Sequence, residues 1–304
     1  MNGLKMIKQK AINICINVDV DTLIHYSNFS TNGVVKDDTI LKCILPRMVD
    51  LFDEIGIKAT FFMVANTLQT SKNLLQDISS RGHEIASHSF SHPQAFHEKS
   101  RKEKAQELVQ SKIELENIIG KQVYGFRAPG YNIDNIVLDE LINAGYTYDS
   151  SLCPGWYVLM VKLATRIKSK TYTSSSTSKI YYWESLFLSK TPFLWCIGCR
   201  KLLEIPITTT RLKKPFIGTV HLNTKRSFFD SEVSWLKKNS SFINYELHPI
   251  EVVSKETFHI APWVKNIPGV GKMDDPWEYL KYRLLAIKAL GDIKLLYQVK
   301  IDEY

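Results

Sequence analysis

Two histidines four residues apart, His88 and His92, have the type and spacing in this chain that most directly indicate chemistry. On a helical turn, residues i and i+4 lie on one side, so both imidazoles could bind one cation. Asp19 and Asp21 stand two residues apart at the end of an apolar run, and on a strand they would face the same way. Two imidazoles and one carboxylate make a three-ligand site with an open position, the pattern of catalytic zinc. The sequence therefore predicts a metal site in which one aspartate binds the ion and the other takes up a proton.

Arg127 and His248 also follow apolar runs and could serve the same site. Arg127 could hold a catalytic carboxylate ionised, and His248 could donate a proton to a leaving group. The simpler alternatives are helix capping for the aspartates, core packing for the histidine pair, a surface arginine, and a strand-end hydrogen bond for His248. Four other histidines have no motif around them and are expected to be structural: His25, His97, His221 and His259.

Apolar runs typical of strands alternate with helical patterns along most of the chain. We expect strands near residues 11–18, 59–64, 83–86, 123–126, 146–148, 203–207 and 243–247, and helices near 38–55, 72–80, 98–119 and 134–144. This alternation indicates a parallel α/β barrel or a doubly wound sheet. In either fold the carboxyl ends of the strands carry the site, and the polar motifs all lie at or just after such ends.

The composition is that of an ordinary globular protein of 304 residues, with 44% hydrophobic and 23% charged residues. No run of about 18 apolar residues is present, and residues 1–10 contain lysines but no apolar secretory stretch. Five cysteines, an odd number, indicate a reducing compartment. We therefore expect a cytoplasmic location. The Cys196–Cys199 pair is not expected to bind metal or act in redox chemistry, because one such pair cannot close a four-ligand site.

The net charge of +8 is concentrated in one stretch. Between Val161 and Val220 there are eleven Lys and Arg residues against Glu184 and Glu204, which gives 11 − 2 = +9. Residues 152–202, which overlap this stretch, interrupt the strand–helix alternation and combine tryptophans with basic residues. We expect this insertion to lie on an anionic membrane surface; the alternative is a solvated basic loop with buried aromatic residues. Nucleic acid is disfavoured because the basic residues are interleaved with apolar runs.

The aspartate, histidine and arginine motifs described above resemble those of the polysaccharide deacetylase family, the carbohydrate esterases with nodulation-deacetylase homology. The motifs follow in the family's order: Asn17-Val18-Asp19-Val20-Asp21, His88-Ser89-Phe90-Ser91-His92, Arg127-Ala128-Pro129 and Leu247-His248-Pro249. The resemblance implies a distorted seven-stranded (β/α) barrel. We expect it to fill residues 1–260, insertion included, with a helical extension over residues 261–304. That extension could pack on the barrel or on the bilayer.

The resemblance also assigns roles, each carried over by motif position. Asp19 is similar to the family's general base, and Asp21, His88 and His92 are similar to its metal ligands. Arg127 corresponds to the support of the base and His248 to the general acid, with an oxyanion-binding N–H expected near Gly130 or Tyr131. The implied ion is a divalent metal, first of all Zn²⁺, although cobalt, iron or manganese would also suit such ligands. The family's fourth motif, an acidic residue that tunes the acid, has two candidates, Asp149 and Glu204.

The spread Asp-Val-Asp arrangement is similar to an intracellular, amide-hydrolysing branch. Further stretches, among them Leu45–Leu51 and Leu203–Ile207, resemble the deformylases of formamido-arabinose carried on undecaprenyl phosphate. The implied function is removal of an N-acyl group, acetyl or formyl, from an amino sugar that is lipid-phosphate-linked or a cell-envelope glycan precursor. The enzyme would then be peripheral on the inner face of the cytoplasmic membrane. The alternatives are a deacetylase of a soluble or polymeric glycan, a cyclic-amide hydrolase of the same fold, and a non-catalytic lipid-binding barrel.

Overall fold

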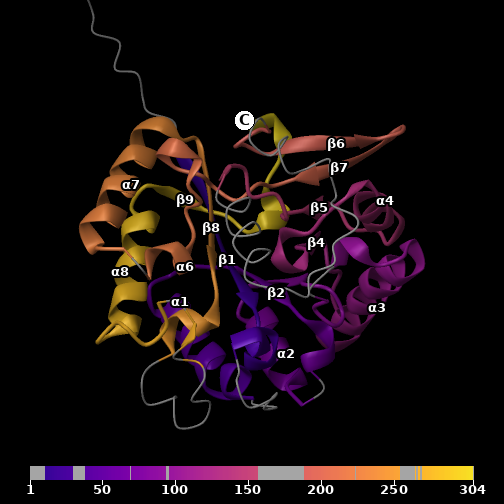
Figure 1. The fold of residues 1–304 in the computed structure, drawn as a ribbon, viewed down its shortest axis with the longest axis horizontal. Coiled ribbons are helices and arrows are strands. Elements are labelled where there is room, and N and C mark those ends of the chain that lie inside the picture. The colour runs from indigo at the N-terminus through magenta and orange to yellow at the C-terminus, as the bar shows by residue number, and fades with distance from the viewer. Residues whose placement is uncertain are drawn as a thin grey trace, which may run out of the picture.

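The computed structural model describes residues 11–29, 38–68, 70–93, 96–156, 188–222, 224–253, 264, 266, 267 and 269–303. Most of the predicted insertion, residues 157–187, therefore lies outside the described residues. A curled sheet of nine strands forms the centre of the fold, with helices packed around it (Figure 1). Its strands are β1 (Ile12–Val20), β2 (Thr60–Met63), β3 (Glu84–Ser87), β4 (Gly125–Phe126), β5 (Tyr148–Asp149), β6 (Phe193–Ile197), β7 (Arg200–Glu204), β8 (Phe242–Leu247) and β9 (Gly291–Ile293).

The sheet is parallel except for one hairpin. Its order is β6-β7-β5-β4-β3-β2-β1-β8, and β9 pairs with the first residues of β1. Only β6 and β7 run antiparallel to each other. All nine residues of β1 are buried, as expected for a central parallel strand covered on both faces. A parallel α/β barrel was predicted, and the curled parallel sheet confirms that fold class, with β6 and β9 as additions.

Six helices of eight or more residues are found in the described part of the chain. They are α1 (Leu45–Glu54), α2 (Lys72–Ser80), α3 (Arg101–Ile119), α4 (Asn135–Asn143), α7 (Arg226–Asn239) and α8 (Pro276–Lys288). Local signals set their ends. Ser100 and Glu103 form a capping box at the start of α3, and Gly120 ends that helix at φ 65°. Asp134 caps α4 by accepting a hydrogen bond from the N–H of Val137.

The core lies between these helices and the sheet. Buried residues of β1, β2 and β8 pack against the inner faces of α1, α3, α4 and α8. The C-terminal extension was predicted to be helical, and this is wrong in part. After α8 the chain forms β9, whose Gly291 backbone lies so close to Ile12 that a Cβ atom would approach the Ile12 carbonyl oxygen to 2.0 Å. The extension therefore completes one edge of β1.

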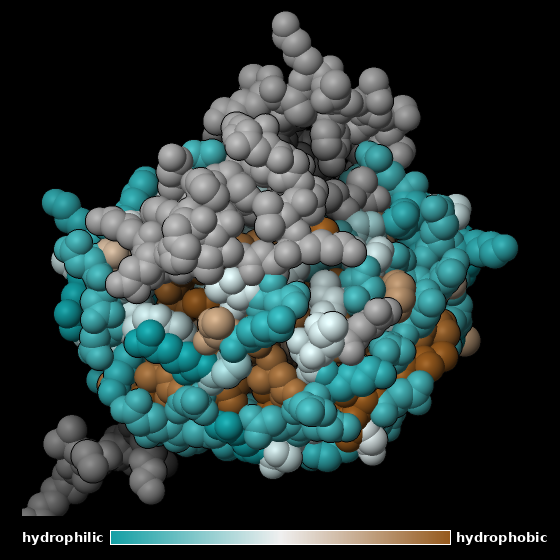
Figure 2. All heavy atoms as spheres, turned by 90° about the horizontal axis from the view of Figure 1, so that it is seen from below, coloured by the Kyte–Doolittle hydropathy of each residue, from teal (hydrophilic) through white to brown (hydrophobic). Residues whose placement is uncertain are grey.

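Viewed from below the orientation of Figure 1, hydrophilic residues form the outline, and hydrophobic ones show between them (Figure 2). Among the described residues, none of the helices has both the length and the apolar character needed to cross a bilayer.

Candidate active site at the carboxyl edge of the sheet

The two aspartates mark the end of β1. Asp19 is the eighth residue of the strand, and Asp21 follows its last residue; both are buried. Asp19 Oδ1 lies 2.6 Å from Arg127 Nη1. Among the described residues, Asp21 Oδ1 is buried without a hydrogen-bond partner. The two carboxylates therefore have different surroundings, one held by a guanidinium and one open to a further ligand.

His88 and His92 follow β3, and here the expectation of a helical turn is wrong. They lie in a loop in which Ser89 and His92 adopt positive φ values of 69° and 54°. Side chains hold this shape: Ser89 Oγ accepts a hydrogen bond from the N–H of His92 at 3.0 Å. Glu107 of α3 accepts two more from the N–H groups of Phe90 and Ser91, at 3.0 and 2.8 Å. The loop, rather than a helical face, brings the two imidazoles to one side.

The loop directs both imidazoles at Asp21. His92 Nε2 lies 3.2 Å and His88 Nε2 lies 3.8 Å from Asp21 Oδ1. The Nδ1 atom of His88 lies 2.8 Å from the carbonyl oxygen of Arg127, which places the proton on Nδ1 and leaves Nε2 as a donor of electrons. A buried carboxylate oxygen without a hydrogen bond and two imidazole nitrogens beside it suit a divalent cation with nitrogen and oxygen ligands.

His25 also belongs to this cluster, although it was expected to be structural. Its ring stacks on that of His92 with 4.3 Å between centroids, and its Nδ1 lies 3.6 Å from Asp21 Oδ1. One possible ligand atom from each of Asp21, His25 and His92 fits within 4.8 Å. The signal was present as an i, i+4 spacing between Asp21 and His25 after the strand. The same Nδ1 accepts a hydrogen bond from the N–H of Thr22 at 3.1 Å, which orients the ring.

Arg127 is fully buried and lies beside Asp19, the proposed general base. Its Nε and Nη2 donate to the carbonyl and hydroxyl of Ser150, at 2.8 and 2.9 Å. Its Nη1 donates to Asn17 and Asp19, at 2.5 and 2.6 Å. Burial opposes ionisation of Asp19, but the guanidinium beside it lowers the pKa of that carboxyl below its ordinary value. Arg127 is thus the orienting partner of Asp19 that its motif position implied.

Glu246, which was not predicted from the sequence, lies beside His248. His248 Nε2 lies 3.6 Å from Glu246 Oε1 and 4.0 Å from Asp21 Oδ2. Burial disfavours the charged imidazole, but the charge of Glu246, followed by those of Asp19 and Asp21, raises the pKa of His248 above its ordinary value. Glu246 is i−2 to His248, and this same-face spacing at the end of β8 could have identified it.

A second group of possible ligand atoms, from Asp19, Glu246 and His248, also fits within 4.8 Å. Because Arg127 already holds Asp19, we interpret this group as proton-transfer residues beside the metal cluster. Glu251 supports His248 from behind: its Oε1 accepts a hydrogen bond from the His248 N–H at 2.9 Å. Arg283 of α8 in turn donates to Glu251 Oε2 at 3.0 Å.

Neither candidate for the fourth motif contacts His248 among the described interactions. Asp149 Oδ1 accepts a hydrogen bond from Ser151 at 2.5 Å. Glu204 accepts from the Leu152 N–H at 2.9 Å and from Trp195 Nε1 at 2.8 Å. Burial raises the pKa of Asp149 to about 6. Glu246 and Glu251 are therefore the acidic neighbours of the proton donor.

The expected oxyanion donors are only partly available. The N–H of Tyr131 donates to the Ala128 carbonyl at 3.0 Å and is engaged within its own turn, so its assignment to an oxyanion stays a prediction. The Tyr131 hydroxyl instead donates to Glu246. Gly130, at φ 59° in the same turn, stays a prediction as an oxyanion donor.

The carboxyl edge of the sheet thus combines side chains suited to a divalent ion with a buried carboxylate held by a guanidinium and an imidazole beside carboxylates, an arrangement typical of metal-assisted hydrolases. Residues 34–148 match the sequence profile of the polysaccharide deacetylases. The chain therefore carries a polysaccharide deacetylase family domain, and that family consists of hydrolases of carbon–nitrogen bonds other than peptide bonds.

Relatives agree with this family assignment. A peptidoglycan deacetylase of Helicobacter pylori is 27% identical over 150 residues, 47% of this chain and 50% of its own length. A peptidoglycan-N-acetylglucosamine deacetylase of Bacillus cereus is 30% identical over 101 residues, 33% of this chain and 46% of its own length. The chain thus matches half or less of each of these relatives.

Solved structures extend the likeness to the whole fold. A Mycobacterium smegmatis protein described as a polysaccharide deacetylase superposes with a TM-score of 0.60 at 17% identity, covering 93% of this chain and 86% of that one. At this level of identity the superposition speaks for the fold alone.

Proposed function

We propose that this protein removes the acyl group from an N-acylated amino sugar of a cell-envelope glycan, with the help of a divalent ion, first of all zinc. One observation carries the proposal. A buried Asp21 oxygen without a hydrogen bond faces two imidazole nitrogens, with the Arg127-held Asp19 and the carboxylate-flanked His248 beside it. This arrangement supports the assignment of a proton acceptor and a proton donor beside side chains that suit an ion.

Asp21, His88 and His92 would hold the ion, which when bound supplies Lewis acidity at the acyl carbonyl. Asp19, kept ionised by Arg127, accepts a proton from the water molecule that attacks the carbonyl carbon. The carbon–nitrogen bond then breaks, and protonated His248 donates its proton to the departing nitrogen. One water is consumed for each amide, and the products are a free amino sugar and a small carboxylic acid.

N-acetylglucosamine in a glycan is the substrate that we infer first, because the relatives carry names of peptidoglycan deacetylases. The finer possibility is a formylated amino sugar on a lipid phosphate. It is favoured by the basic stretch between Val161 and Val220 and by the motif resemblance to the deformylase branch. Release of formate from a formamido sugar on a lipid phosphate, compared with release of acetate from N-acetylglucosamine oligomers, separates the two.

The first test is the variant Asp19→Asn, loaded with zinc. Loss of the proton acceptor should lower acetate release from N-acetylglucosamine oligomers by about 10² to 10⁴-fold. Bound zinc, measured by mass spectrometry of the metal, should stay near one equivalent because Asp19 is not a ligand. Asp77→Asn on the exposed side of α2 is the control and should keep wild-type activity. A fully active Asp19→Asn enzyme would show that the assigned base is wrong.

A further inference from the structure

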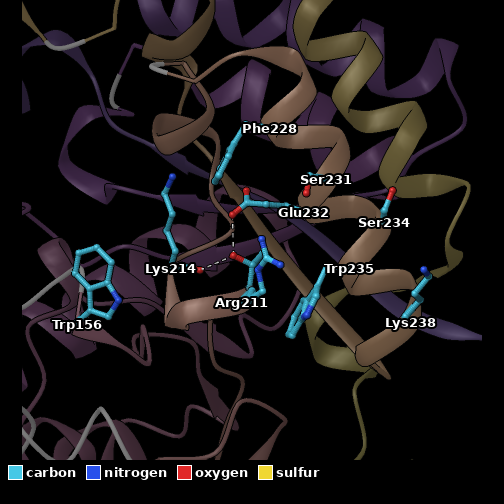
Figure 3. Close-up of a pocket in the computed structure, with 10 residues that line it drawn as sticks. Trp156, Arg211, Lys214, Phe228, Ser231, Glu232, Ser234, Trp235 and Lys238 are labelled. Atoms are coloured by element: carbon cyan, nitrogen blue, oxygen red, sulfur yellow. Dashed lines mark hydrogen bonds between the residues drawn. The ribbon is translucent and has the colours of Figure 1, made fainter.

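A pocket of about 360 Å³ is lined by residues other than those of the candidate active site (Figure 3). One wall is α7 from Phe228 to Lys238, and the others are the turn around Arg211–Lys213 and the residue Trp156 after β5. This volume is in the range of pockets that bind small organic ligands. Its lining combines aromatic rings, cations and hydroxyl groups.

Aromatic rings provide flat, apolar surfaces at the pocket. Trp156 is 42% exposed and Phe228 is 37% exposed, although both are large and hydrophobic. Trp235 borders the other side of the pocket and packs partly against the core, so its indole is held in place. Exposed rings around a cavity indicate a binding surface, because leaving them in water forgoes the free energy of burial. The C–H face of a pyranose ring is apolar and packs against such an indole.

Cations give the pocket a positive charge. Arg211, Lys214 and Lys238 line it, against one carboxylate, Glu232, so the lining carries 3 − 1 = +2. Within the described ranges none of these three cations takes part in an ion pair. The Nζ atom of Lys214 lies 4.0 Å above the ring of Phe228, which keeps it at the pocket.

The single acid of the pocket is already engaged. Glu232 is buried, and its Oε1 accepts a hydrogen bond from Thr210 Oγ1 at 2.7 Å. Its Oε2 lies 2.9 Å from His221 Nε2. Its two oxygens are therefore directed at the protein, and the unpaired cations remain available to an anionic ligand. Ser231 and Ser234, three residues apart on α7, add hydroxyl groups on the same face.

We propose that this pocket binds a carboxylate-bearing sugar unit of the glycan on which the enzyme acts. The ring of the sugar stacks on Trp156 or Trp235, and its carboxylate pairs with Arg211 and Lys214. This inference rests on the proposed function for the identity of the polymer. It adds a second contact with the chain of sugars, which would select glycans that carry acidic units.

The test uses the full chain with Asp19→Asn to suppress turnover. The probe is the disaccharide of N-acetylglucosamine and N-acetylmuramic acid, whose lactyl group supplies the carboxylate, and chitobiose is the neutral disaccharide of equal length. Calorimetry should give at least about tenfold tighter binding of the acidic disaccharide, since a charge-assisted hydrogen bond contributes about 1.5–3 kcal/mol. The indole N–H resonances of Trp156 and Trp235, assigned with Trp→Phe variants, should shift on its addition.

Matched variants locate the binding. Arg211→Ala and Trp156→Ala, both at exposed positions, should each weaken binding of the acidic disaccharide by about tenfold. Lys238→Ala should weaken it, whereas Lys237→Ala, one residue along α7 and outside the pocket lining, should leave it unchanged. Equal affinity for the two disaccharides, or equal effects of the two lysine variants, would overturn the proposal. Because binding is measured without turnover, a failure of deacetylation by the wild-type enzyme would be seen separately.

Discussion

The carboxylate of Asp21 lies among four imidazoles. His92, His25 and His88 come within 3.2, 3.6 and 3.8 Å of its Oδ1, and His248 within 4.0 Å of its Oδ2. Burial raises the pKa of Asp21, because a carboxylate removed from water is costly to ionise. A bound cation would offset that cost directly, so the cluster is suited to hold an ion.

We predict that His25→Ala weakens metal binding by about 10 to 100-fold. Its ring packs on His92 and fixes how that ligand faces Asp21, so the ligand would lose its orientation. The measurement is zinc affinity by competition with a chromophoric chelator. His97→Ala, in the turn Phe96–Glu98, is the control and should bind zinc like the wild type. An unchanged affinity of His25→Ala would remove His25 from the metal site.

Motif spacing was sufficient to predict Asp19, Asp21, His88, His92, Arg127 and His248, and the fold brings these residues together. It was not sufficient for His25 or Glu246. The i, i+4 spacing of Asp21 and His25 is present in the sequence, but His25 reaches the cluster through the 3-10 turn after β1, whose path the spacing alone does not give. The loop conformation at His88 was also beyond prediction, because Glu107, which holds it, comes from a separate helix.

Glu84 shows how one side chain can join several elements. From β3 it accepts hydrogen bonds from Thr60 of β2 at 2.6 Å and from Tyr148 of β5 at 2.8 Å. The N–H of Tyr297, beyond β9, donates to the same carboxyl at 3.3 Å. Burial raises the pKa of Glu84 from its ordinary value of 4.5 to about 7. The folded protein therefore keeps this proton at pH values at which the unfolded chain releases it.

This shift predicts a pH dependence of stability. Between about pH 4.5 and 7 the folded state binds more protons than the unfolded state, so the free energy of unfolding should fall as the pH rises through this window. The contribution of Glu84 is roughly 3 kcal/mol at most, at 1.36 kcal/mol per pKa unit. Urea unfolding at pH 5 and pH 8 measures this change. The free energy of unfolding should fall less between these two pH values in Glu84→Gln than in the wild type. Glu98→Gln is the control and should show the same fall in unfolding free energy as the wild type. If Glu84→Gln also showed the wild-type fall, Glu84 would not be its source.

The net positive charge is a property of the whole molecule and would act on any charged surface near it. The chain has a net charge of +8, and the stretch between Val161 and Val220 alone accounts for 11 − 2 = +9. Each basic residue near an anionic leaflet contributes about 1 kcal/mol of attraction. The membrane contact expected from the sequence stays a prediction, because residues 157–187 lie outside the described part of the chain.

We predict that the protein sediments with vesicles of anionic phospholipid at low salt and is released at about 1 M salt, where the Debye length is about 3 Å. Vesicles of neutral phosphatidylcholine should not retain it. Replacing Lys162, Arg166 and Lys168 by glutamine should reduce retention more than the same change at Lys237 and Lys238. If the wild-type protein stays in solution with anionic vesicles at low salt, the membrane hypothesis fails.

The main topology could be predicted because stretches rich in apolar residues alternate with helical patterns along the chain. Strands β9 and β6 could not be predicted. The residues of β9 are Gly291, Asp292 and Ile293; the first two have low strand propensity, and the strand forms by pairing with the first residues of β1. The partly exposed β6 is antiparallel to β7 across the turn at Gly198, inside a segment that was interpreted as an insertion.

The pairing of β1 with β8 has a consequence for biosynthesis. The three proposed metal ligands and strands β1 to β3 all lie before residue 93, whereas β8 and His248 lie more than 150 residues later. The proposed metal ligands therefore leave the ribosome before His248, the proposed proton donor. Strand β1 cannot pair with β8 until these later residues have been made, so the centre is completed late in synthesis.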